Sequence, residues 1–379
     1  MTLRANGASR PRRVLLLVTD LEVGGTPTVV RELAIRLNDP PRTVIGVACL
    51  SRRGSIANQI ESASVRVTPL NASSWIDLPV FARLARLIRS ECCDTVLSFL
   101  VHANVAAAVV APLFPAVRFL QSIQTTQPAP RWHWLAQSLA HQAATRVVVP
   151  TSSVARVAAD WADVPLSKLV VIANAIDPND FRDTGCQPAA GEREKIAHGL
   201  VARATDRPIP IGFIGRLDPI KRIPDLLEAV RLLNGRVHLN VFGDGSQRSV
   251  LATRIQELKL ERQVTLHGAI ARPQEALRKI ALLVLPSAAE GFGLVLIEAM
   301  VSGVPVVAAN APGICDVVVD GETGLLVPPG SPKGLAKAID RVLGDAALRN
   351  RLVAAARRDV MQRFTWDVVL PRYRALLDL

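Results

Sequence analysis

The chain alternates apolar segments of strand length with segments of helix length, in two separate series. The first series contains the strand-like residues 14–19, 44–50, 65–70, 95–99, 117–123 and 146–149. The second series begins at Ile209 and contains the strand-like residues 211–214, 237–242, 264–267, 282–285 and 304–308. Strands that alternate with helices form parallel βαβ units, because parallel strands need a crossover connection. We therefore predict an α/β protein with two Rossmann-like domains, each a doubly wound parallel sheet, that face a central cleft.

The two series are separated by residues 177–208, which are rich in charge, proline and glycine. This composition is typical of a junction between domains. We place an amino-terminal domain at residues 1–175 and a carboxyl-terminal domain at 176–363, and we expect a final helix over 364–379 to pack back on the first domain. The length of 379 residues agrees with two domains, since single cores stop growing beyond about 250–300 residues.

The cysteines and the apolar segments exclude several classes of protein. The five cysteines are an odd number, and they show neither a Cys-x-x-Cys pair nor a Cys/His cluster with metal-ligand spacing. This pattern disfavours a disulfide framework and a zinc site, and it favours a reducing, cytoplasmic location. The apolar run at 14–18 is too short for a signal peptide or a membrane span.

The positive charge is concentrated in the first half of the chain. The formal net charge is +12, and residues 1–175 carry 18 Lys and Arg against 10 Asp and Glu. Such a surface attracts anionic lipid headgroups, an anionic acceptor or nucleic acid, and simple solubility is the alternative explanation. Because the sequence shows no nucleic-acid motif and no interleaving of aromatic and basic residues, we predict no nucleic-acid partner.

A basic amphipathic segment lies at residues 79–91. Its aliphatic residues fall on one side of a predicted helix, and Arg83, Arg86 and Arg89 fall around the other. Such a helix can lie on an anionic membrane surface, and residues 131–134 (RWHW) add aromatic and basic groups suited to an interface. The alternative is an ordinary surface helix that packs on the sheet.

The strongest local signal is the segment from Glu290 to Glu298 (EGFGLVLIE), which follows a buried strand. Gly291 and Gly293 permit backbone conformations that a Cβ would oppose. The helix that we expect to begin near Leu294 would direct its positive end and its free N–H groups at a phosphate. Two carboxylates beside an anion site suit a ligand that carries both hydroxyls and phosphate. The alternative is a plain helix start with a second, solvated glutamate.

A second signal is the loop Gly215-Arg216-Leu217-Asp218-Pro219-Ile220-Lys221, which follows the strand at 211–214. Arg216 offers a planar fork for phosphate oxygens, and Lys221 adds a mobile point charge. Across a turn both can converge on one diphosphate and stabilise its charge as it leaves, with no metal required. The alternative is a loop with solvated basic side chains.

Two weaker signals lie in the first domain. Gly24 and Gly25 follow the first strand and open a helix, which is a general arrangement for close approach of the backbone to a ligand. They lack the full Gly-x-Gly-x-x-Gly pattern of dinucleotide sites. His102 follows the strand at 95–99, and a neutral imidazole there can orient a hydroxyl near neutral pH. The alternative is a structural histidine or a helix cap.

These motifs together resemble the retaining GT-B glycosyltransferases of family 4, also called glycosyl transferases group 1. The resemblance runs from Gly24 to about Pro329 and so covers most of the chain. Five motifs in order carry it: Glu290 to Gly303 with Pro305, the Gly215-Arg216-Leu217 loop with Lys221, residues 171–177, residues 241–245 and residues 321–327. The resemblance implies a GT-B architecture and transfer of a sugar from a nucleotide diphosphate donor with retention at the anomeric carbon.

The resemblance also implies the roles of individual residues. Glu290 would hydrogen-bond the donor sugar, Glu298 would bind the ribose, and Arg216 with Lys221 would bind the diphosphate. The amides around Phe292, Gly293 and Leu294 would contact the sugar or the distal phosphate. His102 would touch the transferred sugar. The catalytic set is therefore Arg216, Lys221, Glu290 and His102.

Further donor-binding positions follow from the same resemblance. Gly24 and Gly25 of the first domain, and Gly215, Gly243, Ile270 and Gly313 of the second, would approach the donor. Gly313 would lie near the sugar, in a loop where Asp316 takes the acidic position at which the family often has Glu. Ile270 follows a strand near the expected base pocket.

The implied mechanism needs no cofactor, no metal and no acid/base pair, since the leaving phosphate oxygen would assist deprotonation of the acceptor. The implied acceptor is a glycan or a lipid-linked precursor of a cell-envelope polysaccharide, with peripheral contact at the inner face of an anionic membrane. Two other activities stay open. A nucleotide-sugar epimerase on the same fold would need an acid/base set in the cleft. A non-catalytic nucleotide-sugar-binding protein would not need the complete set of Arg216, Lys221, Glu290 and Glu298.

Overall fold

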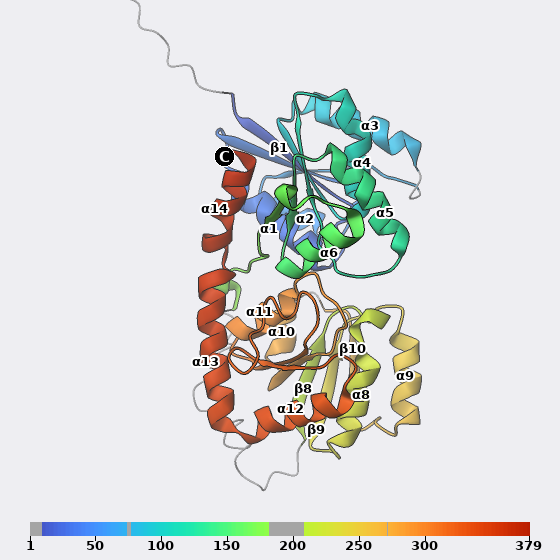
Figure 1. Cartoon of the computed structure of the whole chain (residues 1–379), viewed down its shortest axis with the longest axis vertical. Coiled ribbons are helices and arrows are strands. Elements are labelled where there is room, and N and C mark those ends of the chain that lie inside the picture. The colour runs from blue at the N-terminus through green and yellow to red at the C-terminus, as the bar shows by residue number, and fades with distance from the viewer. Residues whose placement is uncertain (1–9, 74–76, 182–207, 271) are drawn as a thin grey trace, which may run out of the picture.

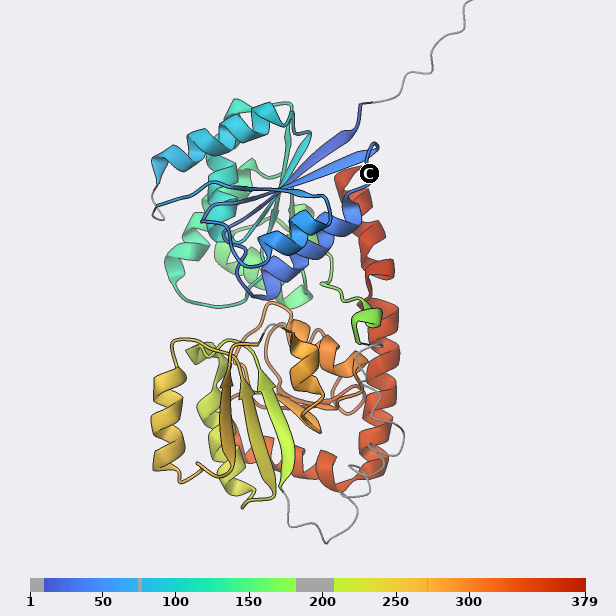
Figure 2. The same ribbon diagram turned by 180° about the vertical axis from the view of Figure 1, so that it is seen from behind.

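The computed structural model describes residues 10–73, 77–181, 208–270 and 272–379. Figure 1 shows two lobes stacked along the long axis, with the last two helices running along one side of both. Figure 2 shows the same arrangement from behind. Each lobe contains one parallel sheet, which confirms the α/β fold class with two Rossmann-like domains. Residues 182–207 of the predicted junction lie outside the described residues.

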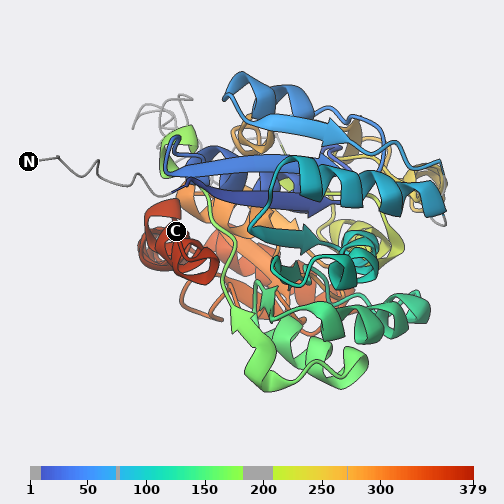
Figure 3. The same cartoon turned by 90° about the horizontal axis from the view of Figure 1, so that it is seen from above.

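The first domain is built on a seven-stranded sheet with the order β3-β2-β1-β4-β5-β6-β7, in which every pairing is parallel. Figure 3 shows helices on either side of these strands. The strands are Arg12–Val18 (β1), Thr43–Cys49 (β2), Arg66–Pro69 (β3), Thr95–Phe99 (β4), Arg118–Ser122 (β5), Arg146–Val149 (β6) and Leu169–Val171 (β7). The helices are Gly25–Leu37 (α1), Ala57–Ser62 (α2), Leu78–Ser90 (α3), Val101–Val110 (α4), Arg131–Ala140 (α5) and Ser152–Ala162 (α6).

The strands of this sheet are apolar because helices cover both of its faces. All five residues of β4 are buried, as expected for a parallel sheet covered on both sides. Helix α3 packs Val80, Leu84 and Ile88 into the core on one face. The apolar side of α3 is therefore not available to a membrane. Arg86 and Arg89 on its other side remain exposed.

The second domain is built on a six-stranded sheet with the order β10-β9-β8-β11-β12-β13, again entirely parallel. Its strands are Ile209–Ile214 (β8), Val237–Phe242 (β9), Val264–Gly268 (β10), Leu282–Leu285 (β11), Val306–Ala309 (β12) and Leu325–Val327 (β13). Its helices are Ile223–Leu232 (α8), Arg248–Glu257 (α9), Pro273–Leu277 (α10), Leu294–Val301 (α11), Pro332–Gly344 (α12) and Ala346–Arg363 (α13). Short 3₁₀ turns lie at Ala111–Leu113 (η1), His141–Ala143 (η2), Leu166–Lys168 (η3), Pro178–Phe181 (η4) and Pro219–Lys221 (η5).

The last helix, Trp366–Leu377 (α14), belongs to the core of the first domain although it follows the second domain in sequence. Trp366, Val369 and Tyr373 are buried against residues of the first sheet and of α1. The chain therefore passes between the domains twice. The two passages are hydrogen-bonded to each other, since the Ile176 amide donates to the Phe364 carbonyl over 2.9 Å.

The strand order of each sheet reverses at one point. The loops that carry predicted site residues lie at these two points. The first reversal lies between β1 and β4, and the second lies between β8 and β11. Gly24 and His102 follow the strands of the first reversal, and Arg216 and Glu290 follow those of the second. Doubly wound folds bind ligands at such points, outside the carboxyl ends of the strands.

Candidate functional site

The loop after β11 meets the first domain at Glu290, and every polar group of this residue is hydrogen-bonded. Its amide donates to the Pro312 carbonyl over 3.0 Å. Its carbonyl accepts from the Thr126 hydroxyl over 2.7 Å. Its carboxylate accepts from the Lys221 ammonium over 2.6 Å, with both side chains largely buried. The position of Glu290 is thus fixed by three different segments before any ligand arrives.

Glycines allow the backbone to crowd around this residue. A Cβ on Gly313 would overlap the Glu290 carbonyl, with its carbon only 2.7 Å away, and Gly313 also has a φ of +83°. A Cβ on Gly291 would overlap the main chain of Gln124 in the first domain, with the Gln124 carbonyl carbon at 2.6 Å. Both positions therefore require glycine for close approach of two main chains.

The start of α11 lies beside this residue, as the sequence predicts. Gly293 precedes the helix with a φ of +78°, a left-handed conformation that favours glycine. Phe292 is buried and meets Phe364 edge to face, with ring centroids 5.3 Å apart. This contact anchors the loop. The Leu296 amide donates to the Gly293 carbonyl over 2.9 Å, whereas the described residues offer no acceptor to the amides of Leu294 and Val295. No acidic side chain lies in the first turn of α11 to compete for those groups.

The two predicted diphosphate ligands of the loop after β8 have different surroundings. Lys221, in η5, lies against Glu290 with a side chain only 15% exposed. Arg216 is 73% exposed and pairs with Asp218, at 2.9 Å from Nε to Oδ2. The structure therefore brings Lys221 and Glu290 together, whereas Arg216 is held by its own loop.

Glu298 lies one turn into α11 with a half-buried side chain. The described part of the chain supplies no hydrogen bond to its carboxylate. Burial removes water from the charged form and raises the pKa of this carboxyl to about 7. The group can therefore be either a carboxylic acid or a carboxylate near neutral pH, depending on what binds beside it.

The glycine pair of the first domain reaches the same region. Gly24 has an extended backbone and precedes α1. A Cβ on Gly25 would lie 3.6 Å from Cδ1 of Leu294, which is an ordinary van der Waals distance. The loop after β1 therefore touches the first residue of α11. Gly24, Gly25 and Leu294 lie together, as expected for one site.

Gly215, Gly243 and Ile270 occupy the loops beside β8, β9 and β10. A Cβ on Gly243 would overlap the main chain of Gly215, with its carbonyl carbon at 2.9 Å. The Gly243 amide donates to the Gly268 carbonyl over 2.7 Å. These contacts give Gly243 a packing role between neighbouring loops. Ile270 is half-buried against the core of the second domain.

His102 forms a cluster of rings on the first domain instead of a contact with the Glu290 loop. Its ring lies edge to face with Trp132 and His133, with centroid distances of 5.7 and 5.4 Å. Burial lowers the pKa of His102, so the imidazole is neutral at physiological pH. None of its ring contacts among the described residues involves the Glu290 segment.

Asp316 forms a contact between the domains. One of its carboxylate oxygens accepts from the Ser153 amide over 3.1 Å, at the amino-terminal end of α6. A negative charge is favourable there because it meets free N–H groups and the positive end of the helix dipole. This oxygen is thus already bound to protein, which argues against Asp316 as the acidic ligand of a sugar.

Sequence reasoning missed the residues of the first domain that touch the Glu290 loop. Thr126 binds the Glu290 carbonyl, and Thr151 donates to the Gly291 carbonyl over 3.2 Å. Gln124 lies against Gly291, and its side chain accepts from Asn174 over 3.2 Å. The polar run QTTQ directly after a buried strand was the available signal, because carboxyl ends of parallel strands carry ligand sites.

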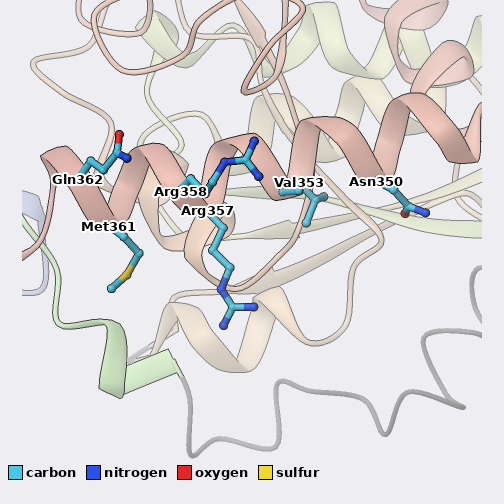
Figure 4. Close-up of a pocket in the computed structure, with 7 residues that line it drawn as sticks. Asn350, Val353, Arg357, Arg358, Met361 and Gln362 are labelled. Carbon is cyan, nitrogen blue, oxygen red and sulfur yellow. The ribbon is translucent and has the colours of Figure 1, made fainter.

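Outside this region the described residues form no metal site and no membrane-spanning helix, but they do form a surface hollow. The described residues bring no three His, Cys, Asp or Glu side chains together in a way that could hold a metal ion. None of the helices in the described ranges has the length and apolar content needed to cross a bilayer. A surface hollow of about 670 Å³ lies along α13 (Figure 4) and contains none of the predicted site residues. It is lined by Asn350, Val353, Ala354, Arg357, Arg358, Met361 and Gln362.

Two protein-family models match the chain, one for each domain. The model described as Glycosyltransferase Family 4 matches residues 23–180. The model described as Glycosyl transferases group 1 matches residues 201–359. Together they cover every strand of the two sheets except β1, and every residue assigned above to the site.

Curated relatives and solved structures agree with these matches. An uncharacterized glycosyltransferase of Methanocaldococcus jannaschii is 30% identical over 211 residues, 54% of this chain and 52% of the relative. The poly(ribitol-phosphate) alpha-N-acetylglucosaminyltransferase of Staphylococcus aureus is 31% identical over 172 residues, 44% of this chain and 35% of the relative. The chain thus spans about half the length, or less, of these curated relatives.

The crystal structure of HepE from Anabaena in complex with UDP-glucose superimposes with a TM-score of 0.83. The match covers 97% of this chain and 100% of that one, at 23% identity. At this identity the likeness concerns the fold.

Proposed function

Because the chain belongs to the GT-B glycosyltransferases, with a family 4 and a group 1 domain, we propose that it uses a nucleotide diphosphate sugar as donor and retains the anomeric configuration. One observation carries the proposal. Lys221 and Glu290 are paired at 2.6 Å where two neighbouring strands end, beside the start of α11. The cation and the free main-chain amides suit the diphosphate of such a donor, and the carboxylate suits the hydroxyls of its sugar.

The donor site follows from the hydrogen-bonding capacity of these groups. The Lys221 ammonium has three N–H donors, and Glu290 accepts one of them, so two remain for phosphate oxygens. The start of α11 adds main-chain N–H groups. The second oxygen of the Glu290 carboxylate accepts from sugar hydroxyls, and Glu298 accepts from the ribose. Arg216 exchanges its ion pair with Asp218 for a second phosphate contact.

The reaction is a substitution at the anomeric carbon. The bond from this carbon to the diphosphate oxygen breaks, and its electron pair goes to the leaving nucleoside diphosphate. A bond forms from the acceptor oxygen to the same face of the carbon, and the acceptor proton goes to the leaving phosphate oxygen. Lys221 and the start of α11 stabilise the charge that develops on the diphosphate. No base from the protein is required, and no metal enters the proposal.

The acceptor is proposed to be a growing glycan or a lipid-linked precursor of a cell-envelope polysaccharide. The matched Staphylococcus aureus relative acts on poly(ribitol-phosphate), an anionic polymer. The first 175 residues of this chain carry 18 Lys and Arg against 10 Asp and Glu. A basic domain opposite the donor site suits an anionic acceptor, because charge complementarity speeds encounter.

We also propose a cytoplasmic location with peripheral contact to an anionic membrane. The four described cysteines are free thiols, which supports a reducing compartment. Arg86 and Arg89 are exposed on α3, and Trp132 and Leu135 are 43% and 67% exposed on α5. Cosedimentation with anionic liposomes at low salt, lost at high salt, is the expected result. Absence of binding at low salt would remove the membrane from the proposal.

The decisive test is a screen of UDP-, GDP- and ADP-sugars for binding and for slow hydrolysis without acceptor. We expect one nucleotide to bind and to be hydrolysed slowly, and we expect chelation of divalent metal to leave this rate unchanged. The stereochemistry of the transferred product, read by NMR, tests retention. An epimerised sugar without hydrolysis indicates an epimerase, and binding with no chemistry on any acceptor indicates a sensor.

A further inference from the structure

We propose that Thr126 and Thr151 are positioning residues, through which the first domain holds the Glu290–Gly291 segment of the second domain in place. The donor site is then complete only when the two domains are closed on each other. The inference rests on the proposed function, because it assumes that Glu290 contacts the donor. It goes beyond that function by assigning part of the donor site to side chains that never touch the donor.

The Thr126 hydroxyl has a hydrogen bond that crosses the domain boundary. The side chain is 3% exposed, and its hydroxyl donates to the Glu290 carbonyl over 2.7 Å. The other two polar groups of Glu290 are bound within the second domain, by Pro312 and Lys221. Thr126 therefore supplies the one constraint on Glu290 that depends on the relative position of the domains.

Thr151 uses its hydroxyl in two directions. As the residue before α6 it accepts from the Val154 amide over 3.1 Å, which caps the helix. The same hydroxyl donates its proton to the Gly291 carbonyl over 3.2 Å. Thr151 is 3% exposed, and loss of its hydroxyl would remove both the cap of α6 and the bond to the Gly291 carbonyl.

The main chains of the two domains meet at the same place with no space between them. A Cβ on Gly291 would overlap the Gln124 main chain, whose carbonyl carbon would lie 2.6 Å away. Gln124 cannot easily yield, because its side chain donates to Ser122 over 2.7 Å and accepts from Asn174 over 3.2 Å. Close packing and the hydroxyls of Thr126 and Thr151 thus set the distance between the domains at Glu290, which carries the proposed sugar-binding carboxylate.

A third contact supports closure from the side of α6. The Ser153 amide, two residues after Thr151, donates to the Asp316 carboxylate over 3.1 Å. The Asp316 carbonyl in turn accepts from Arg363 at the end of α13, over 2.7 Å. The first turn of α6, with its capping residue Thr151, therefore binds both the Gly291 loop and the Asp316 segment. Movement of this turn would release both segments together.

The first experiment replaces Thr126 by valine, which has the same shape but no hydroxyl, and by serine, which keeps the hydroxyl. Hydrogen exchange, measured on the full chain without donor, gives the exchange rates of the amides of residues 290–297. Thr126→Val should speed this exchange by about ten-fold, the equivalent of one net hydrogen bond, and Thr126→Ser should restore it. Thr145→Val, which removes a hydroxyl bond to Phe119 inside the first domain, is the matched control.

The second experiment opens the domains sterically. Gly291→Ala should raise the radius of gyration in small-angle scattering, because the new methyl group overlaps the Gln124 main chain. Gly344→Ala is the control, since nothing lies within 4 Å of the added Cβ. Identical scattering for Gly291→Ala and wild type would overturn the close contact on which the proposal depends.

Turnover then separates positioning from simple stability. With the nucleotide sugar that the wild type hydrolyses fastest, Thr126→Val should lower kcat by about ten-fold while KM changes little, since a positioning loss falls on the transition state. Thr126→Ser should recover kcat. Faster exchange with unchanged kcat would overturn the positioning role. If the wild type binds and hydrolyses no nucleotide sugar, the proposed function fails, whereas the exchange and scattering results still decide the contact.

Discussion

Lys221 and Arg216 come from one loop and carry the same charge, yet they are held in opposite ways. The Lys221 side chain is 15% exposed and bound to Glu290, a residue that three segments fix. The Arg216 side chain is 73% exposed, and among the described residues it binds Asp218, two residues away. One half of the proposed diphosphate site is thus preorganised, whereas the other half must rearrange when the donor binds. Preorganised charges stabilise a transition state at lower reorganisation cost.

The largest effect is expected for Lys221→Ala. The substitution removes the buried charge nearest to the proposed leaving group, and kcat should fall by about 10²–10³, the range seen for single preorganised donors. The melting temperature should change far less than turnover. Donor kinetics and thermal unfolding of the same samples measure the two effects. Unchanged turnover in a folded variant would remove Lys221 from the mechanism.

A smaller effect is expected for Arg216→Ala. An exposed, mobile side chain must give up its ion pair with Asp218 before it binds phosphate, so kcat/KM should fall by only about ten-fold, or about 1.4 kcal/mol. Asp218→Asn frees the guanidinium and should leave kcat/KM equal to or above that of wild type. A loss for Arg216→Ala as large as that for Lys221→Ala would contradict the difference between the two halves.

The smallest effect concerns Glu298 and is a matter of pH. Its folded pKa is raised from 4.5 to about 7, so between these values the folded chain binds more protons than the unfolded chain. Stability therefore falls as pH rises from about 4.5 to 7. Water screens this half-buried side chain in part, so we expect a contribution on the order of 1 kcal/mol. Glu298→Gln should remove this decline. Denaturant unfolding at pH 5 and pH 7.5 measures the difference, and parallel curves for both proteins would refute the shift.

Local patterns were sufficient for most of the fold, because each buried parallel strand is a short apolar run between turns. The predictions of strands at 95–99, 237–242 and 282–285 agree with β4, β9 and β11 residue for residue, and the helix expected to begin near Leu294 is α11. The strands β7 and β13 were missed, since three residues give no periodicity. Helix α13 was missed because its apolar residues form only a narrow stripe among charged residues.

The sequence alone determined which loops carry the site residues, because glycines, charged residues and a helix start are recognised from short local motifs. Glu290, Lys221 and the start of α11 were selected in this way. Only the tertiary structure shows that Arg216 forms an ion pair with Asp218 and that the His102 ring packs against Trp132. It also shows that Asp316 accepts a hydrogen bond from the first turn of α6. It also brought Thr126 to Glu290 across 164 residues of chain. The contacts of Asp316 and Thr126 depend on how two separately folded sheets meet, and no local spacing encodes that geometry.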